Sequence, residues 1–154
     1  MIANLGTTLN GIENLAFGAI DPSILAGKAF EQAYNRGRRD QLWARLIGRT
    51  RQLELLASQP VESHRSASRI VSVPIRQIKG TLGRSTDFDL DFNPLKQYCR
   101  TRWISILTAI LRGSSMPPVE LLQVGASYYV RDGHHRISVA KAIGQQAIDA
   151  CLVN

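Results

Sequence analysis

The feature that most restricts the fold of this chain is a change of hydrophobic period along its second part. From Ile70 onward, segments that alternate apolar and polar residues are separated by segments with apolar residues three and four positions apart. The pattern predicts strand, loop, helix, hairpin, helix and strand at 70–75, 80–93, 95–112, 119–130, 134–143 and 147–153. Such an order predicts a small α/β (α+β) domain, with a mixed sheet packed against helices.

The first part of the chain has a helical pattern instead. Asp21-Pro22 predicts a helix start, because Asp accepts free N–H groups there and Pro is tolerated in the first turn. An apolar stripe continues the pattern through residue 57, as one helix or two, and consists of Leu42, Leu46, Leu53 and Leu56. We therefore predict a poorly ordered arm at 1–20, a helical extension at 21–58, a linker at 59–69 and the α/β domain at 70–154.

Charge and composition limit the range of partners. The net charge is +7, and 15 of the 19 basic residues are Arg, whose planar fork suits phosphate groups. The sequence shows neither a signal-peptide pattern nor an apolar run near the ~20 residues that span a bilayer, so we expect a cytoplasmic protein without a membrane partner. The two cysteines, Cys99 and Cys151, exclude a disulfide framework. Oligomerisation stays open.

The most informative segment runs from Tyr128 to Ala140, where a strand ends, Gly133 turns the chain and a helix begins. Backbone N–H groups at a helix start lack intrahelical acceptors and favour an anion. His134, His135 and Arg136 occupy the first turn, where the helix dipole disfavours cations. This placement predicts a negatively charged ligand, for which phosphate is the best candidate.

A purely structural interpretation of the same segment stays open. In it Asp132 caps the helix, Arg136 pairs with Asp132 or Asp149, and His135 is a core histidine with satisfied hydrogen bonds. A metal site is less favoured, because adjacent histidines on a helix point about 100° apart and do not share one ion.

The stretch from Val71 to Val153 resembles the domain shared by ParB chromosome-partitioning proteins, sulfiredoxin and the free-serine kinases. The matching segments are Val73-Pro74-Ile75, Arg84, the helix before Gly113, Pro118-Val119, and the motif Asp132-Gly133-His134-His135-Arg136. In partitioning proteins the motif is Gly-Glu-Arg-Arg and holds the phosphates of CTP. In sulfiredoxin it is Gly-Gly-Cys-His-Arg, and His134 stands here in place of the nucleophilic Cys. The free-serine kinases carry Asp-Gly-His-His-Arg, as this chain does.

The resemblance implies a nucleotide site. Its binding residues would be Arg84, Asp132, Gly133, His134, His135 and Arg136, and its ligand ATP, ADP or CTP with Mg²⁺. The activity would be nucleotide binding, with hydrolysis or phosphoryl transfer as options. Whether the protein is an enzyme stays open, and a degenerate interaction scaffold is a further alternative.

An acidic loop from Arg84 to Asn93 offers catalytic candidates. Asp87, Asp89 and Asp91 alternate with apolar residues, and an extended chain would turn the Asp outward and Phe88, Leu90 and Phe92 inward. Asp87 or Asp89 would then hold Mg²⁺ or act as a general base beside His134. In the alternative the Asp pair with Arg100 or Arg102. The spacing excludes an EF-hand, since Phe92 and Tyr98 replace its Gly and Glu.

The Arg-rich segment 36–51 suggests a second function. Six arginines there could contact the phosphate backbone of DNA, or form a solvated face. The alternative function is therefore a DNA-associated ParB-like regulator, or a protein of the ParB-like nuclease family, switched by nucleotide. It would lack its own helix-turn-helix, and no two-metal carboxylate cluster is visible that would support nuclease chemistry.

Overall fold

The computed structural model describes residues 20–56 and 69–153. It contains three α-helices: α1 (Pro22–Leu46), α2 (Arg100–Leu111) and α3 (His134–Ala142). Its strands are β1 (Glu54–Leu55), β2 (Ile70–Pro74), β3 (Ile78–Thr81), β4 (Val119–Val124), β5 (Ser127–Asp132) and β6 (Ala147–Val153). Short 3₁₀ turns occupy Ile75–Gln77 and Gln97–Cys99. The described helices include none that is long and apolar enough to cross a membrane.

The strands form one mixed six-stranded sheet in the order β1-β3-β5-β4-β6-β2. β4 and β5 form the antiparallel hairpin that the Gly125-Ala126 turn predicts, whereas β3 runs parallel to β5 and β6 parallel to β4. β2 closes one edge by antiparallel pairing with β6. The predicted α/β class with a mixed sheet is confirmed, and so are the two strands at 70–74 and 147–153.

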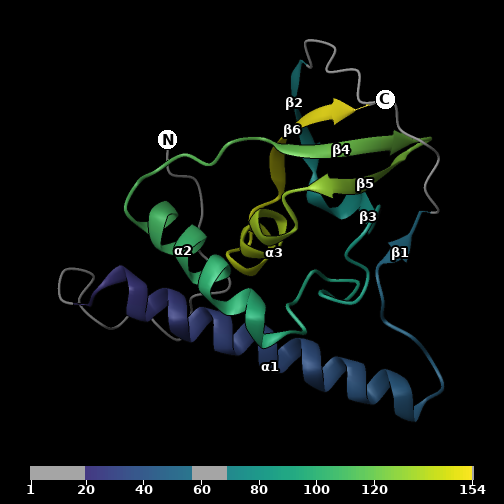
Figure 1. Ribbon diagram of the computed structural model, residues 1–154, viewed down its shortest axis with the longest axis horizontal. Coiled ribbons are helices and arrows are strands. Elements are labelled where there is room, and N and C mark those ends of the chain that lie inside the picture. Colours follow the sequence, from purple (N-terminus) through teal and green to yellow (C-terminus); the bar gives the residue numbers. More distant parts are fainter. Residues whose placement is uncertain (1–19, 57–68, 154) are drawn as a thin grey trace.

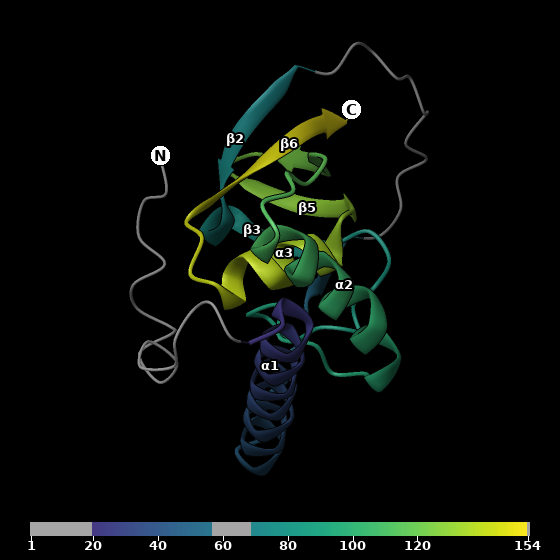
Figure 2. The same ribbon diagram turned by 90° about the vertical axis from the view of Figure 1, so that its left-hand side faces the viewer.

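The helices lie on one side of the sheet. Figures 1 and 2 show α3 against the strands, α2 beside it, and α1 farthest from the sheet. Phe30 of α1 packs edge-on against Trp103 of α2, with ring centroids 5.6 Å apart. The indole N–H of Trp103 in turn donates to Ser138 Oγ of α3 at 2.8 Å. The fully buried Phe30 and Trp103 therefore join all three helices into one core.

The predicted helical extension is too long. α1 begins as expected at Asp21, whose side chain accepts from the N–H of Ser23, but it ends at Leu46. Residues 47–56 are not helical, and Glu54 and Leu55 pair with β3 instead. Leu53 lies outside any helix, but its side chain is buried, with 2% exposed. Its apolar character therefore reflects burial and not a helical period. The predicted arm, most of the predicted linker and residue 154 lie outside the described residues.

Two further predictions were wrong around the acidic loop. β3 was missed because Gly80 suggests a loop, yet a Cβ there would collide with the Glu54 carbonyl and lie 2.8 Å from the Tyr129 ring. Gly80 thus permits close packing of neighbouring strands. Helix α2 starts at Arg100 rather than after Asn93-Pro94, because Asn93 is held by Asp89 inside the loop.

Candidate functional site

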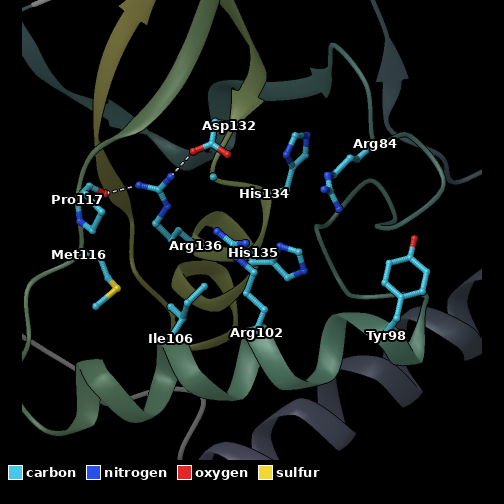
Figure 3. A pocket seen from close by; sticks show the side chains of 11 residues that line it. Arg84, Tyr98, Arg102, Ile106, Met116, Pro117, Asp132, His134, His135 and Arg136 are labelled. Carbon is cyan, nitrogen blue, oxygen red and sulfur yellow. Dashed lines mark hydrogen bonds and ion pairs between the residues drawn. The ribbon is translucent and has the colours of Figure 1, made fainter.

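A pocket of about 440 Å³ opens at the first turn of α3 (Figure 3). Its walls come from α3, from α2 and from the segment that leads into β4, and its lining residues are Arg84, Tyr98, Arg102, Ile106, Met116, Pro117, Asp132, Gly133, His134, His135 and Arg136. All six predicted ligand-binding residues therefore lie together. Figure 3 shows Arg102 and Ile106 rising from α2 toward the start of α3.

Gly133 sets the direction in which α3 leaves the sheet. Its φ of 103° is in the left-handed region, and a Cβ there would lie 2.5 Å from Cγ1 of Val119. Glycine alone fits this turn without strain. No side chain caps α3. The first hydrogen bond within the helix is donated by the N–H of Ile137 to the carbonyl oxygen of Gly133, at 3.0 Å. The N–H groups of residues 134–136 are thus left for a ligand or water.

His134 is held in its neutral form. Its Nε2 lies 2.6 Å from Thr81 Oγ1, and that oxygen already accepts from the N–H groups of Gly83 and Arg84. The Thr81 hydroxyl also lies 3.4 Å from the Val130 carbonyl oxygen, which is a second acceptor for its hydrogen. Burial, followed by the charge of Arg84, lowers the pKa of His134 to about 4.

His135 is neutral for related reasons. Its ring meets Phe88 edge-on, with centroids 5.3 Å apart. Burial, followed by the charges of Arg102 and Arg84, lowers its pKa to about 4. The expectation of three cations in the first turn is therefore wrong, since both histidines are uncharged at neutral pH. The first turn of α3 therefore holds one cation, Arg136, rather than three.

The guanidinium of Arg136 is engaged within the protein. It donates to the carbonyl oxygens of Pro117 and Pro118 at 2.6 and 2.8 Å and forms an ion pair with Asp132 at 2.6 Å. The dashed lines in Figure 3 mark the bonds to Pro117 and Asp132. This is the pairing that the structural interpretation predicts. Arg136 thus joins the start of α3, the end of β5 and the segment before β4.

Two other arginines supply positive charge to the pocket. Arg84 is about half exposed and lies 3.3 Å from the Asp87 carboxylate. Arg102 is exposed on α2, and within 20–56 and 69–153 it forms no ion pair. The alternative pairing of Arg102 with an Asp of the acidic loop is therefore wrong. Tyr98, in the 3₁₀ turn before α2, is 66% exposed at the pocket rim.

Asp87 sits behind the pocket wall. Its carboxylate is buried and accepts from the hydroxyl of Tyr98 and from Arg84. The bond to Asp87 raises the pKa of Tyr98 to about 12, so its phenol stays protonated. Asp87 does not line the pocket itself, but both of its side-chain partners do. A direct role in catalysis would require these two bonds to rearrange.

Asp89 lies outside the pocket. It is fully buried and accepts from the backbone N–H groups of Asp91 and Asn93 and from the Asn93 amide. Burial raises its pKa. The expected in-and-out alternation is wrong here, since Asp87 and Asp89 are buried while Leu90 is 42% exposed. Asp89 organises the loop and is not placed to act on a pocket ligand.

The third carboxylate of the loop, Asp91, pairs with Arg51 and with Lys141 Nζ, the latter at 3.6 Å. Neither is the Arg100 or Arg102 that the sequence suggested. Within the part of the chain that the structure describes, no three His, Cys, Asp or Glu side chains gather as a metal site would require.

Comparison with known proteins gives one structural likeness. A scan against protein-family models found no match, and neither did a search of curated proteins. Among solved structures, the chain is similar to sulfiredoxin from Arabidopsis thaliana, with a TM-score of 0.38 and 21% identity over 55% of this chain and 83% of that one. Sulfiredoxin is one of the groups that residues 132–136 resemble in sequence. The α/β class of this chain is defined by its own strand order.

Proposed function

We propose that this pocket binds the phosphate groups of a nucleoside di- or triphosphate such as ATP, ADP or CTP. The main observation in support is that α3 starts without a side-chain cap in a pocket that Arg84 and Arg102 also line. Helix N–H groups and arginine forks are complementary to phosphate oxygens in both charge and geometry. Arg102 adds a charge that no described carboxylate neutralises.

The shape of the pocket supports a ligand with a second, apolar end. Its volume of about 440 Å³ is within the usual range for small-molecule sites. Ile106, Met116 and Pro117 form an apolar wall beside the cationic part. A base or sugar would lie against this wall while the phosphates face α3.

The residues have distinct roles in this proposal. Arg84 and Arg102 contact phosphate, Gly133 shapes the turn, and Arg136 with Asp132 holds the pocket wall. Mg²⁺ would be carried by the phosphates and water, because Asp132 is bound to Arg136. Of the residues proposed for catalysis, only His134 faces the ligand, and a pKa near 4 makes it a weak base at neutral pH. Nucleotide binding is thus better supported than turnover.

Calorimetry with ATP, ADP, CTP and GTP in the presence of Mg²⁺ tests the proposal. We expect Arg102→Gln to weaken binding about tenfold or more, since a hydrogen bond to a charged group contributes about 1.5–3 kcal/mol. Arg112→Gln is the matched control: it removes an exposed arginine at the end of the same helix, outside the pocket. Equal affinity of wild type and Arg102→Gln, or no binding of any nucleotide, would refute the proposal. Measuring nucleotide hydrolysis in parallel tells an enzyme from a binding module.

The second candidate function is DNA association through α1. Arg36, Arg38 and Arg45 are exposed on this helix, and Arg49 follows its end. The expected Arg-rich helix over 36–51 is therefore shorter than predicted, and Arg51 pairs with Asp91. DNA affinity should fall steeply with salt, by a log–log slope of about 0.9 for each phosphate neutralised. Replacing Arg38, Arg45 and Arg49 by Gln should flatten that slope, and absence of binding at low salt would end this candidate.

A further inference from the structure

The C-terminal end of α1 carries an apolar patch that the described part of the chain leaves exposed. Its four large side chains are between 57% and 79% exposed, and they are Leu42, Trp43, Leu46 and Ile47. At about 100° per residue, these positions fall within one sector of the helix, while the buried Ala33, Gly37 and Ala44 lie on the other side. We call these four residues the α1 tip patch.

The α1 tip patch lies at an extremity of the molecule. Figures 1 and 2 both show the C-terminal end of α1 projecting beyond the rest of the described chain, on the side away from the sheet. A contiguous exposed apolar patch of this kind marks a contact with another molecule. A protruding tip also suits a broad, flat partner, because no neighbouring element within 20–56 and 69–153 blocks its approach.

Arginines surround the patch. Arg39 precedes it by one turn in the same sector, Arg38 and Arg45 lie beside it, and Arg49 follows directly. Asp40 is the only acidic residue between 32 and 53. This surrounding charge disfavours a second copy of the chain, which would bring like charges together. Four side chains also fall short of the 20–30 residues per side of a stable dimer interface.

We propose that the α1 tip patch docks the protein on an anionic lipid surface. Leu and Ile side chains would enter the boundary between headgroups and acyl chains, and Trp43 would lie at the interface, where Trp is enriched. The arginines would reach the lipid phosphates and the carboxylates of acidic headgroups. Duplex DNA would match the arginines but leave the apolar side chains in water. The proposal revises the expectation of a protein without a membrane partner. It requires only a peripheral contact, since no described helix is long and apolar enough to span a bilayer.

Flotation of the full chain with vesicles tests this proposal. We expect binding to vesicles of equimolar phosphatidylcholine and phosphatidylserine, with loss of most binding on phosphatidylcholine alone. Binding to the mixed vesicles should shift the emission of Trp43 to the blue, whereas Trp103, fully buried, reports no change. Leu46→Ser should weaken binding about tenfold or more, and Arg45→Gln about fivefold.

Matched controls separate the patch from a general effect of charge or apolarity. Ile24→Ser changes a 54% exposed residue at the opposite end of α1, and Arg76→Gln removes an exposed charge elsewhere. Both should bind vesicles like the wild type. Thermal unfolding of each variant confirms that it is folded.

Three outcomes would overturn the proposal. The first is absence of binding to the mixed vesicles, and the second is binding that Leu46→Ser does not reduce. The third is self-association, or binding to duplex DNA, that depends on Leu42 and Leu46 while vesicles are not bound. Nucleotide affinity plays no part in these measurements, so the result stands independently of the pocket.

Discussion

Replacing Arg136 by Ala should destabilise the protein in the absence of any ligand. The side chain is only 15% exposed, and it donates to the carbonyls of Pro117 and Pro118. A hydrogen bond from a charged donor contributes about 1.5–3 kcal/mol, but the Pro117 carbonyl regains water when the bond is lost. The ion pair adds little, because the Asp132 side chain is 63% exposed and solvent screens it. We therefore expect a loss of about 2–3 kcal/mol.

Differential scanning fluorimetry without nucleotide measures this loss. At roughly 2–4 °C per kcal/mol for a chain of this size, Tm should fall by about 4–12 °C. Asp132→Asn is the control, since it removes only the screened ion pair and should lower Tm by a small part of that amount. If Arg136 is instead a ligand residue, its removal leaves Tm unchanged or raises it, because a cation leaves the helix start. That result, with a nucleotide affinity at least tenfold weaker, would refute our account of Arg136.

Four further predictions concern the pocket and its surroundings. Burial keeps His134 and His135 neutral with pKa values near 4, against about 6.5 in an unfolded chain, so the unfolded state binds more protons between these values. Stability measured by urea unfolding should therefore fall as pH is lowered from about 6.5 to 4, and the double variant His134→Gln/His135→Gln should flatten the profile. Gly133→Ala should lower the free energy of unfolding by about 2 kcal/mol or more in the same assay, because of its positive φ and the collision of the new Cβ with Val119. Gly125→Ala is the control and should lower it less, because Gly125 is also at positive φ but lies in open space. Burial raises the pKa of Cys99 to about 11, so its thiol should resist labelling by a disulfide reagent until the protein unfolds. Because His134 stands at the motif position where sulfiredoxin has its nucleophilic Cys, the protein should not reduce sulfinic acids. Reductase activity that survives replacement of both cysteines would contradict this interpretation of the site.

The parts of the fold that sequence predicted best are those where local pattern and burial agree. The hairpin around Gly125-Ala126 carries an alternating apolar pattern and a turn glycine at positive φ, and helix α3 is bounded by Gly133 and Gly144, both at positive φ. Segments fixed by distant contacts were missed. β1 has two residues and exists because it pairs with β3, and Gly80 of β3 is required by its neighbours rather than by its own backbone.

The candidate site was predicted in its location but not in its electrostatics. Residues 132–136 gather at the pocket, as the strand–turn–helix pattern indicates. The hydrogen-bond partner of His134 is Thr81, 53 positions earlier, and the partners of Arg136 include carbonyls near residue 117. Periodicity carries no information on such pairs. The alternative pairing of Arg102 with an Asp was wrong for the same reason.

The contact of α1 with the core has a consequence for how the chain can be divided. Phe30 and Ala26 are fully buried, and Phe30 packs on Trp103, so α1 supplies part of the interior rather than an appendage. β1 adds an edge strand beside β3. A fragment that starts at Ile70 would expose Trp103 to water and leave β3 without a neighbour on one side. A folding unit must therefore include α1 and β1, and separately produced fragments 20–56 and 69–154 should recover the native structure only when mixed.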